Sequence, residues 1–177
     1  VTEGLVAGAE ALRVGPGMDD ATDMGPVVSE QQMNSILAHI RAAAAEGAVI
    51  ATGGIRVGEE GYFLAPTVIT ETTPEMRINL EEVFGPVISI IPFDTMDEAI
   101  AIANATEYGL TAQVWTRDIA AANTFSNALE SGSVWVNGKS MDIALPFGGF
   151  RQSGWGMEKG AEGVEIYTRT KTVVQAF

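Results

Sequence analysis

The chain has 177 residues, of which 46% are hydrophobic and 19% are charged, a balance typical of a globular protein with a sizeable core. Its 23 acidic residues outnumber its 10 basic ones, and the formal net charge of −13 argues against nucleic acid or an anionic membrane as a partner. The absence of cysteine excludes a disulfide framework, a thiolate metal site and a cysteine nucleophile within these residues.

The sequence also carries no membrane or secretion signal. No apolar stretch approaches the roughly 18 residues that span a bilayer, and the N-terminus lacks a basic segment followed by an apolar one. We therefore expect a cytoplasmic protein without a membrane partner, in which the glycosylation sequon Asn104-Ala105-Thr106 is a chance match.

The first part of the chain predicts two helices. The first is expected to end over Leu5 to Leu12, before the Gly-Pro-Gly turn at residues 15–17. The second begins after Ser29, where Gln32 completes a capping box, and continues with apolar residues at helical spacing to about Gly47.

The chain's one histidine lies in this second helix. His39 falls on the predicted polar flank, and no cysteine, aspartate or second histidine stands at ligand spacing from it. We expect His39 to be solvated or structural, and we expect no metal site.

Strands then alternate with helices, some of which carry capping residues such as Thr95 and Asp118. Strand, helix, strand, helix and strand within about 50 residues indicate right-handed crossovers. The predicted fold class is therefore α/β, with a parallel twisted sheet and helices on both faces. The expected elements are extended pieces over 49–52 and 61–69, strands over 87–91, 110–115 and 133–137, and helices over 96–105 and 118–130, the last stopped by Gly132.

The loop before the strand at 87–91 has the chemistry of a ligand-facing loop. Glu81 and Glu82 offer carboxylate oxygens that suit a vicinal diol such as a ribose, and the Phe84 ring can lie against a flat heterocycle. Gly85 permits close backbone approach, and Pro86 fixes φ as the strand begins. A simpler interpretation, which composition alone favours, has solvated acids, Phe84 in the core and only a turn at Gly85-Pro86.

A second glycine-rich segment, residues 146–156, follows the last predicted parallel strand, where open α/β sheets place their sites. Its glycines predict either backbone passing close to a ligand or a tight connection in which they relieve crowding. Residues 168–177 are predicted to form an edge strand that pairs outside its own domain.

Taken together, four segments in this order and spacing resemble the C-terminal part of an NAD(P)-dependent aldehyde dehydrogenase, over nearly the whole chain. They are Glu81-Glu82-Val83-Phe84-Gly85-Pro86-Val87, Ser133-Val134-Trp135-Val136-Asn137, Pro146-Phe147-Gly148-Gly149 and Ser153-Gly154-Trp155-Gly156.

The resemblance implies a division of the chain. Residues 1–152 would be most of the catalytic domain, starting after the nucleophile, with the cofactor domain absent. Residues 153–167 would be a return segment and residues 168–177 an oligomerisation strand that gives a homodimer or homotetramer in the full-length enzyme.

The resemblance also implies cofactor-binding residues, for NAD or NADP. Glu82 takes the position that holds the nicotinamide-side ribose, with Phe84 against the nicotinamide region and Glu81 as a solvated neighbour. Gln32 matches a position near the adenosine ribose, although Ser35 stands where some relatives carry a lysine.

On the substrate side, the resemblance implies an aldehyde tunnel. Phe147 matches an aromatic residue that lines it. Residues 138–145 match the substrate-specificity loop, in which Asp142 and Ile143 are candidate lining residues.

In the family, the reaction begins when a cysteine thiolate attacks the aldehyde. Hydride transfer to the nicotinamide follows, and a thioester results. A water molecule activated by a glutamate base then hydrolyses the thioester to the carboxylic acid. Neither that cysteine nor that glutamate falls within this chain, so we expect the isolated chain to be inactive and to contain no catalytic residue. One interpretation is a piece of a complete oxidoreductase, and the other is a non-catalytic association or cofactor-binding domain derived from that family.

Overall fold

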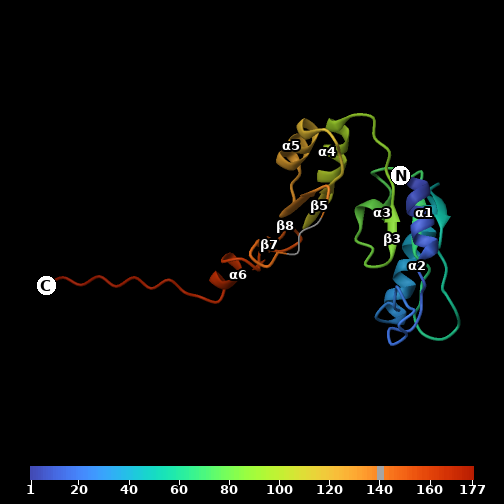
Figure 1. The fold of residues 1–177 in the computed structure, drawn as a ribbon, viewed down its shortest axis with the longest axis horizontal. Coiled ribbons are helices and arrows are strands. Elements are labelled where there is room, and N and C mark those ends of the chain that lie inside the picture. The colour runs from blue at the N-terminus through green and yellow to red at the C-terminus, as the bar shows by residue number, and fades with distance from the viewer. Residues whose placement is uncertain (139–141) are drawn as a thin grey trace. The chain divides into compact units, whose positions relative to one another are not determined.

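The computed structural model describes residues 1–138 and 142–177, and the chain divides into two compact units, Val1–Pro92 and Phe93–Phe177. Each unit combines strands with helices, which confirms the α/β class (Figure 1). The division falls inside the segment 1–152 that we assign to a catalytic domain, and the domain boundaries drawn from the sequence stay a prediction.

The first unit contains a three-stranded sheet in the order β1 (Val49–Thr52), β2 (Thr67–Thr70) and β3 (Val87–Ser89). Strands β2 and β3 are parallel, whereas β1 is antiparallel to β2. Helices α1 (Thr2–Ala11) and α2 (Glu30–Ala45) both pack against this sheet.

The core of the first unit forms where one face of α2 meets the sheet. The helix buries apolar residues at helical spacing, and the central strand β2 is buried on both faces, as expected for a strand between two helices. Full burial of one such isoleucine stabilises the fold by about 1.5–3 kcal/mol. The core residues are Met33, Ile36, Ile40, Ala43, Ala48, Leu64, Ile69 and Ile78.

The start of α2 confirms half of the predicted capping box. The Ser29 hydroxyl accepts a hydrogen bond from the Gln32 backbone N–H at 3.2 Å. The Gln32 side chain does not return to Ser29 but donates to the carbonyl oxygen of Phe84. A distant carbonyl acceptor, at Phe84, has thus replaced the local backbone N–H donor of Ser29 as the partner of this side chain.

The second unit is built around a β-α-β element. Strands β5 (Thr111–Val114) and β6 (Ser133–Val136) are parallel, and α5 (Ile119–Ala128) connects them beside α4 (Met96–Asn104). The predicted caps are present: Thr95 accepts from the Glu98 N–H at 3.2 Å, and Asp118 accepts from the Ala120 N–H at 2.8 Å.

Helix α5 ends at Ala128, two residues earlier than predicted, and Gly132 is not its terminator. The Asn104 side chain takes over the helix end by donating to the Ala128 carbonyl at 2.8 Å and accepting from the Glu130 N–H at 2.9 Å. Gly132 instead allows close approach, because a Cβ there would lie 1.8 Å from the carbonyl oxygen of Gly148.

The glycine-rich segment folds into short antiparallel pairs. Strand β7 (Phe147–Gly148) pairs with β9 (Met157–Glu158), and β8 (Phe150–Arg151) pairs with β4 (Tyr108–Gly109). A Cβ at Gly148 would lie 2.2 Å from the Met157 sulfur and 3.0 Å from the Gly156 carbonyl oxygen, so the glycine relieves crowding between these segments. The tight-connection interpretation therefore holds at this position.

Two parts of the predicted architecture differ in the described residues. The strands lie in separate sheets, β1–β3 in one and β5–β6 in another, and β1 runs antiparallel, so a single parallel sheet is not formed. Apart from the short helix α6 (Glu162–Glu165), the end of the chain from residue 159 onward has no helix or strand. The predicted C-terminal strand stays a prediction. Within residues 1–138 and 142–177, no helix is both long and apolar enough to cross a bilayer.

Replacement of Asn104 by alanine should destabilise the second unit by about 1–3 kcal/mol, because the end of α5 loses a donor and an acceptor together. Urea denaturation would measure the change. Asn123→Ala, at an exposed position of α5, is the matched control and should change the free energy of unfolding by no more than about 0.5 kcal/mol. Equal effects of the two substitutions would contradict the role of Asn104.

Candidate functional site

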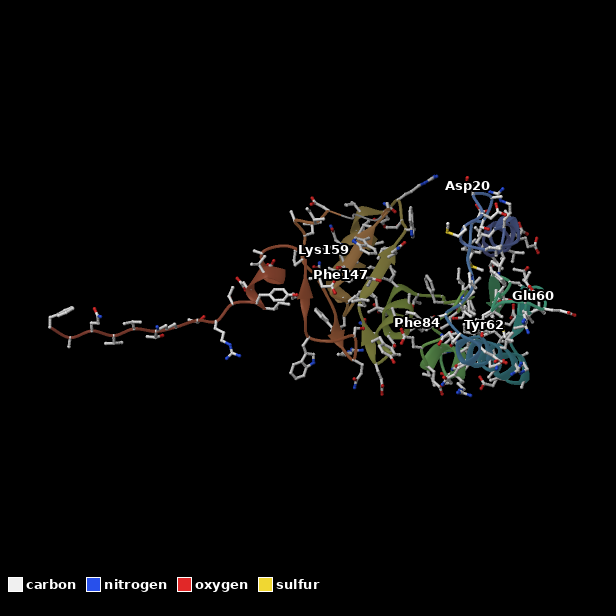
Figure 2. The ribbon with its side chains drawn as sticks, turned by 90° about the horizontal axis from the view of Figure 1, so that it is seen from below. Asp20, Glu60, Tyr62, Phe84, Phe147 and Lys159 are labelled. Carbon is white, nitrogen blue, oxygen red and sulfur yellow. The ribbon has the colours of Figure 1, made fainter. Side chains whose placement is uncertain are left out.

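The loop of residues 81–86 is anchored at both ends and exposes the side chain of Phe84 between them. It follows the short helix α3 (Arg77–Leu80), and the Glu81 N–H donates to the Arg77 carbonyl at 3.0 Å. At the other end the carbonyl of Pro86 accepts from the Thr67 N–H of β2 at 2.9 Å. Phe84 stands between these anchors with 76% of its surface exposed (Figure 2). The simpler interpretation, with this ring in the core, is therefore wrong.

The two neighbouring acids of this loop have different environments. Glu81 receives Arg77 Nε at 2.8 Å on one carboxylate oxygen and His39 Nε2 at 3.0 Å on the other. The hydrogen bond from Arg77 lowers the pKa of Glu81 most, and the hydrogen bond from His39 lowers it further. Glu81 is exposed, as expected of a solvated neighbour, but both of its carboxylate oxygens are also engaged by protein side chains, which we did not predict.

Glu82 is the acid that is available to a ligand. Its side chain is exposed, and within the described ranges its carboxylate makes no hydrogen bond or ion pair. An ionised carboxylate with free acceptor oxygens can bind the two hydroxyl groups of a diol.

His39 lies on the buried face of α2, not on the polar flank that we predicted. It is 8% exposed, its Nδ1 lies 2.9 Å from the carbonyl oxygen of Ser35, and its Nε2 contacts Glu81. The structural role is confirmed and the solvated alternative is wrong. Its position three residues after Ile36 and one before Ile40, both core residues, was the signal that could have placed it inward.

Gln32 and Phe84, two of the three predicted cofactor residues, meet at one hollow of about 410 Å³. The hydrogen bond from the Gln32 amide to the Phe84 carbonyl joins α2 to the loop. Glu82 belongs to the same loop but does not line this hollow. The lining residues are Val27, Val28, Gln32, Val83, Phe84 and Gly85.

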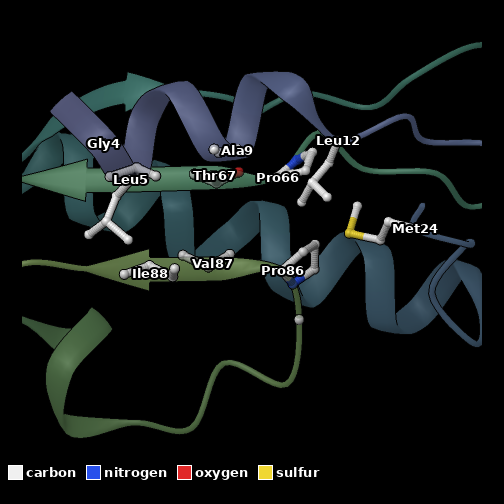
Figure 3. A pocket seen from close by; sticks show the side chains of 13 residues that line it. Gly4, Leu5, Ala9, Leu12, Met24, Pro66, Thr67, Pro86, Val87 and Ile88 are labelled. Atoms are coloured by element: carbon white, nitrogen blue, oxygen red, sulfur yellow. The ribbon is translucent and has the colours of Figure 1, made fainter. Parts of the chain in front are cut away.

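A second hollow of the first unit is apolar. It has a volume of about 370 Å³ and lies between α1 and the strands β2 and β3 (Figure 3). In this view α1 lies in front of β2 and α2 behind the strands, so this sheet has a helix on each face, as predicted. Among its described lining residues the only polar side chain is Thr67, whose hydroxyl is engaged by the Gly54 N–H and the Ala65 carbonyl. The described lining of this hollow is therefore apolar and leaves no polar side chain available to bind a ligand.

The second unit contains a hollow of about 490 Å³ that brings together Phe147 and Asp142, two of the three predicted substrate residues. Asp142 accepts from the Ala144 N–H at 2.9 Å. Ile143 is 79% exposed and does not line the hollow. Residues 139–141 of the predicted specificity loop lie outside the described residues. The lining residues are Ser133, Val134, Trp135, Asp142, Leu145, Pro146, Phe147, Glu158 and Lys159.

Lys159 is a residue of this hollow that our sequence reasoning missed. Its ammonium lies 5.3 Å from the centre of the Phe147 ring, within reach of a cation–π interaction (Figure 2). The pairing of β7 with β9 brings the two together. The two strands are separated by only eight residues in sequence, but the sequence carries no pattern that indicates their pairing.

Comparisons with known proteins agree with one another. The profile of the aldehyde dehydrogenase family matches residues 1–173. The putative aldehyde dehydrogenase DhaS of Bacillus subtilis strain 168 is 44% identical over 174 residues, which are 98% of this chain and 35% of that protein. The betaine aldehyde dehydrogenase of Rhizobium etli is 44% identical over 173 residues, which are 96% of this chain and 36% of that protein.

Among solved structures, the NAD+ complex of aldehyde dehydrogenase from Bacillus cereus superposes with a TM-score of 0.92 at 44% identity. The match covers 97% of this chain and 35% of that chain. The present chain therefore spans about a third of the length of the relatives that it matches.

The pairing of Glu81 predicts a pH dependence of stability. Because the folded-state pKa of Glu81 is lowered, its contribution is present above the ordinary range of a glutamate carboxyl and is lost as the pH falls through the folded value. The free energy of unfolding of the wild type should therefore fall more between about pH 6 and about pH 3 than that of Glu81→Gln. Urea denaturation at both pH values measures this difference. Glu82→Gln, which removes an unpaired carboxylate, should behave like the wild type, and a flatter profile in this control would contradict the assignment.

Proposed function

The chain belongs to the aldehyde dehydrogenase family, and on that premise we propose that it forms the C-terminal part of an enzyme that oxidises an aldehyde to a carboxylic acid with NAD or NADP. The observation that carries the proposal is the loop of residues 81–86, where an unpaired carboxylate and an exposed aromatic ring stand two residues apart. The NAD+ complexes of similar proteins support a dinucleotide as the ligand of this loop.

The residues of the loop fit a nicotinamide nucleotide. The free oxygens of Glu82 suit the ribose hydroxyls, and the Phe84 ring offers an uncovered face to a flat heterocycle. Gln32 fixes the loop backbone through the Phe84 carbonyl, so in this proposal it holds the loop in addition to approaching the adenosine ribose. The bound dinucleotide would supply the hydride acceptor.

The substrate side of the proposal rests on the second unit. The Phe147 ring and the Asp142 carboxylate would form part of the wall that an aldehyde meets, with Ile143 as a more exposed neighbour. Lys159 beside Phe147 adds a positive charge to this wall. We assign the specificity of the substrate to these side chains together with residues outside this chain.

The nucleophile must come from the remainder of the enzyme, because this chain contains no cysteine, and we propose that the glutamate base comes from there as well. We further propose that residues 1–152 form most of the catalytic domain and that residues 153–167 form the return segment. Residues 168–177 would then add a strand to a sheet of a neighbouring subunit. Valines and a phenylalanine of that last segment are exposed here, as expected if they are covered in a homodimer or homotetramer. A cytoplasmic location belongs to the same proposal.

The assay that tests the function uses the complete enzyme with an aldehyde and NAD. Glu82→Gln should raise the KM for NAD about 10- to 100-fold, since a charged acceptor of two hydrogen bonds becomes a neutral one. Asn34→Ala, at an exposed position of α2 without a side-chain hydrogen bond among the described contacts, is the control and should leave KM within about twofold. An unchanged KM in Glu82→Gln would remove Glu82 from the cofactor site.

The isolated chain of 177 residues should not turn over any aldehyde, because removal of the nucleophile normally costs many powers of ten in rate. An NAD-coupled assay of homogeneous protein, verified by mass measurement, tests this. Measurable turnover would overturn the assignment of the nucleophile to the rest of the enzyme. Complete enzyme that binds NAD but oxidises no aldehyde would support the alternative of a non-catalytic cofactor-binding protein.

A further inference from the structure

We propose that His39 is a positioning residue for the loop of residues 81–86. When its ring is doubly protonated, it holds this loop against α2, and when its ring is neutral, it releases the loop. The inference rests on the proposed function in one respect only, namely that the positioned loop binds the cofactor. The switch itself follows from contacts within the first unit.

The first step is the number of protons that the ring needs. Nδ1 faces the carbonyl oxygen of Ser35 at 2.9 Å and Nε2 faces a carboxylate oxygen of Glu81 at 3.0 Å. A carbonyl can only accept, and the lowered pKa of Glu81 keeps its carboxylate ionised and equally an acceptor. A neutral imidazole has one N–H and can satisfy only one of them, whereas the imidazolium satisfies both.

The second step is the cost of the neutral form. His39 is 8% exposed, so water has little access to a ring nitrogen that has lost its proton. Whichever nitrogen loses the proton, its lone pair then faces the lone pair of an oxygen at hydrogen-bonding distance. The ring must turn, or the Glu81 end of the loop must move away.

The third step is the surrounding charge. Arg77 Nε binds the other oxygen of Glu81 at 2.8 Å, and the Arg77 backbone N–H donates to the Glu46 carboxylate at 3.0 Å. Glu81 is the charged group that contacts the ring, Arg77 is linked to the ring through Glu81, and Glu46 is linked to it only through the Arg77 backbone. The arginine restrains the carboxylate, so it cannot follow a turned ring without breaking a second ion pair.

The fourth step is the spacing along α2. Gln32, Ile36 and His39 stand four and three residues apart and share one helix face. Gln32 donates to the Phe84 carbonyl, and Ile36 packs so closely on Gly85 that a Cβ there would lie 2.3 Å from its Cδ1. His39 holds Glu81 at the start of the loop. One face of α2 therefore holds the loop at three points, and His39 is the only one of these three contacts made by a titratable side chain.

The test uses the isolated chain, whose one histidine gives one set of ring signals in NMR. In acid both ring nitrogens should be protonated, and as the pH rises the amide signals of Phe84 and Gly85 should move with the same midpoint as the ring. Amide signals of Phe84 and Gly85 that do not shift with the titration of the ring would overturn the proposal. A ring that carries a single proton across the whole titration would overturn it too. This measurement needs no substitution, so a variant that fails to fold cannot obscure it.

Two variants sharpen the test. In Glu81→Gln the ring should still titrate while the loop signals no longer follow it, because the carboxylate that links them is gone. In His39→Gln, where the side chain cannot titrate, the loop signals should be independent of pH over the same range. Loop signals that still follow pH in His39→Gln would assign the switch to another group.

The complete enzyme separates this inference from the proposed function. The Kd for NAD should weaken about three- to tenfold from the acid to the alkaline side of the ring's titration in the wild type, and should stay constant in His39→Gln. If the loop follows the ring but NAD does not bind, the proposed function fails and the positioning role stands. If NAD binds with a Kd that does not depend on the protonation of the His39 ring, the positioning role fails and the proposed function stands.

Discussion

The packing of one face of α2 is the constraint on which the first unit depends. Met33, Ile36 and Ile40 fill the space between the helix and the sheet, and Ile36 is 1% exposed. The same isoleucine presses on Gly85, where no side chain fits. The hydrophobic contact that stabilises the core therefore also sets the distance between the helix and the loop. Gln32 and His39 lie within reach of the loop only because this packing holds.

The electrostatics of the loop follow from that arrangement. Glu81 lies where His39 and Arg77 can reach it, and it becomes part of the scaffold. Glu82, one residue later, makes no ion pair with either and keeps its oxygens free within the part of the chain that the structure describes. The residue that holds the loop, Glu81, and the residue that would face a ligand, Glu82, are thus adjacent glutamates. A loop that binds a polar ligand needs both, because a free carboxylate is useful only if its backbone is held in place.

Local interactions of the fold were predictable, and contacts between distant segments were not. Ser29, Thr95 and Asp118 each cap the helix that the sequence assigns to them, since a cap involves only neighbouring residues. The early end of α5 depends on Asn104, 24 residues before the carbonyl to which it donates. Likewise, nothing local shows that β1 is antiparallel to β2 or that β4 pairs with β8, because strand partners are chosen by packing.

The sequence by itself determined the family resemblance, the α/β class and the loop that carries Glu82 and Phe84, because ordered short motifs and local propensities are properties of the chain. Only the tertiary structure decided that Glu81 is paired, that His39 is buried with two acceptors, and that Gln32 holds the Phe84 carbonyl. The contacts of His39 with Glu81 and of Gln32 with Phe84 join residues that are 42 and 52 positions apart in sequence. The pKa, the burial and the hydrogen-bond partner of a side chain are properties of its surroundings, and the surroundings form only when the chain folds.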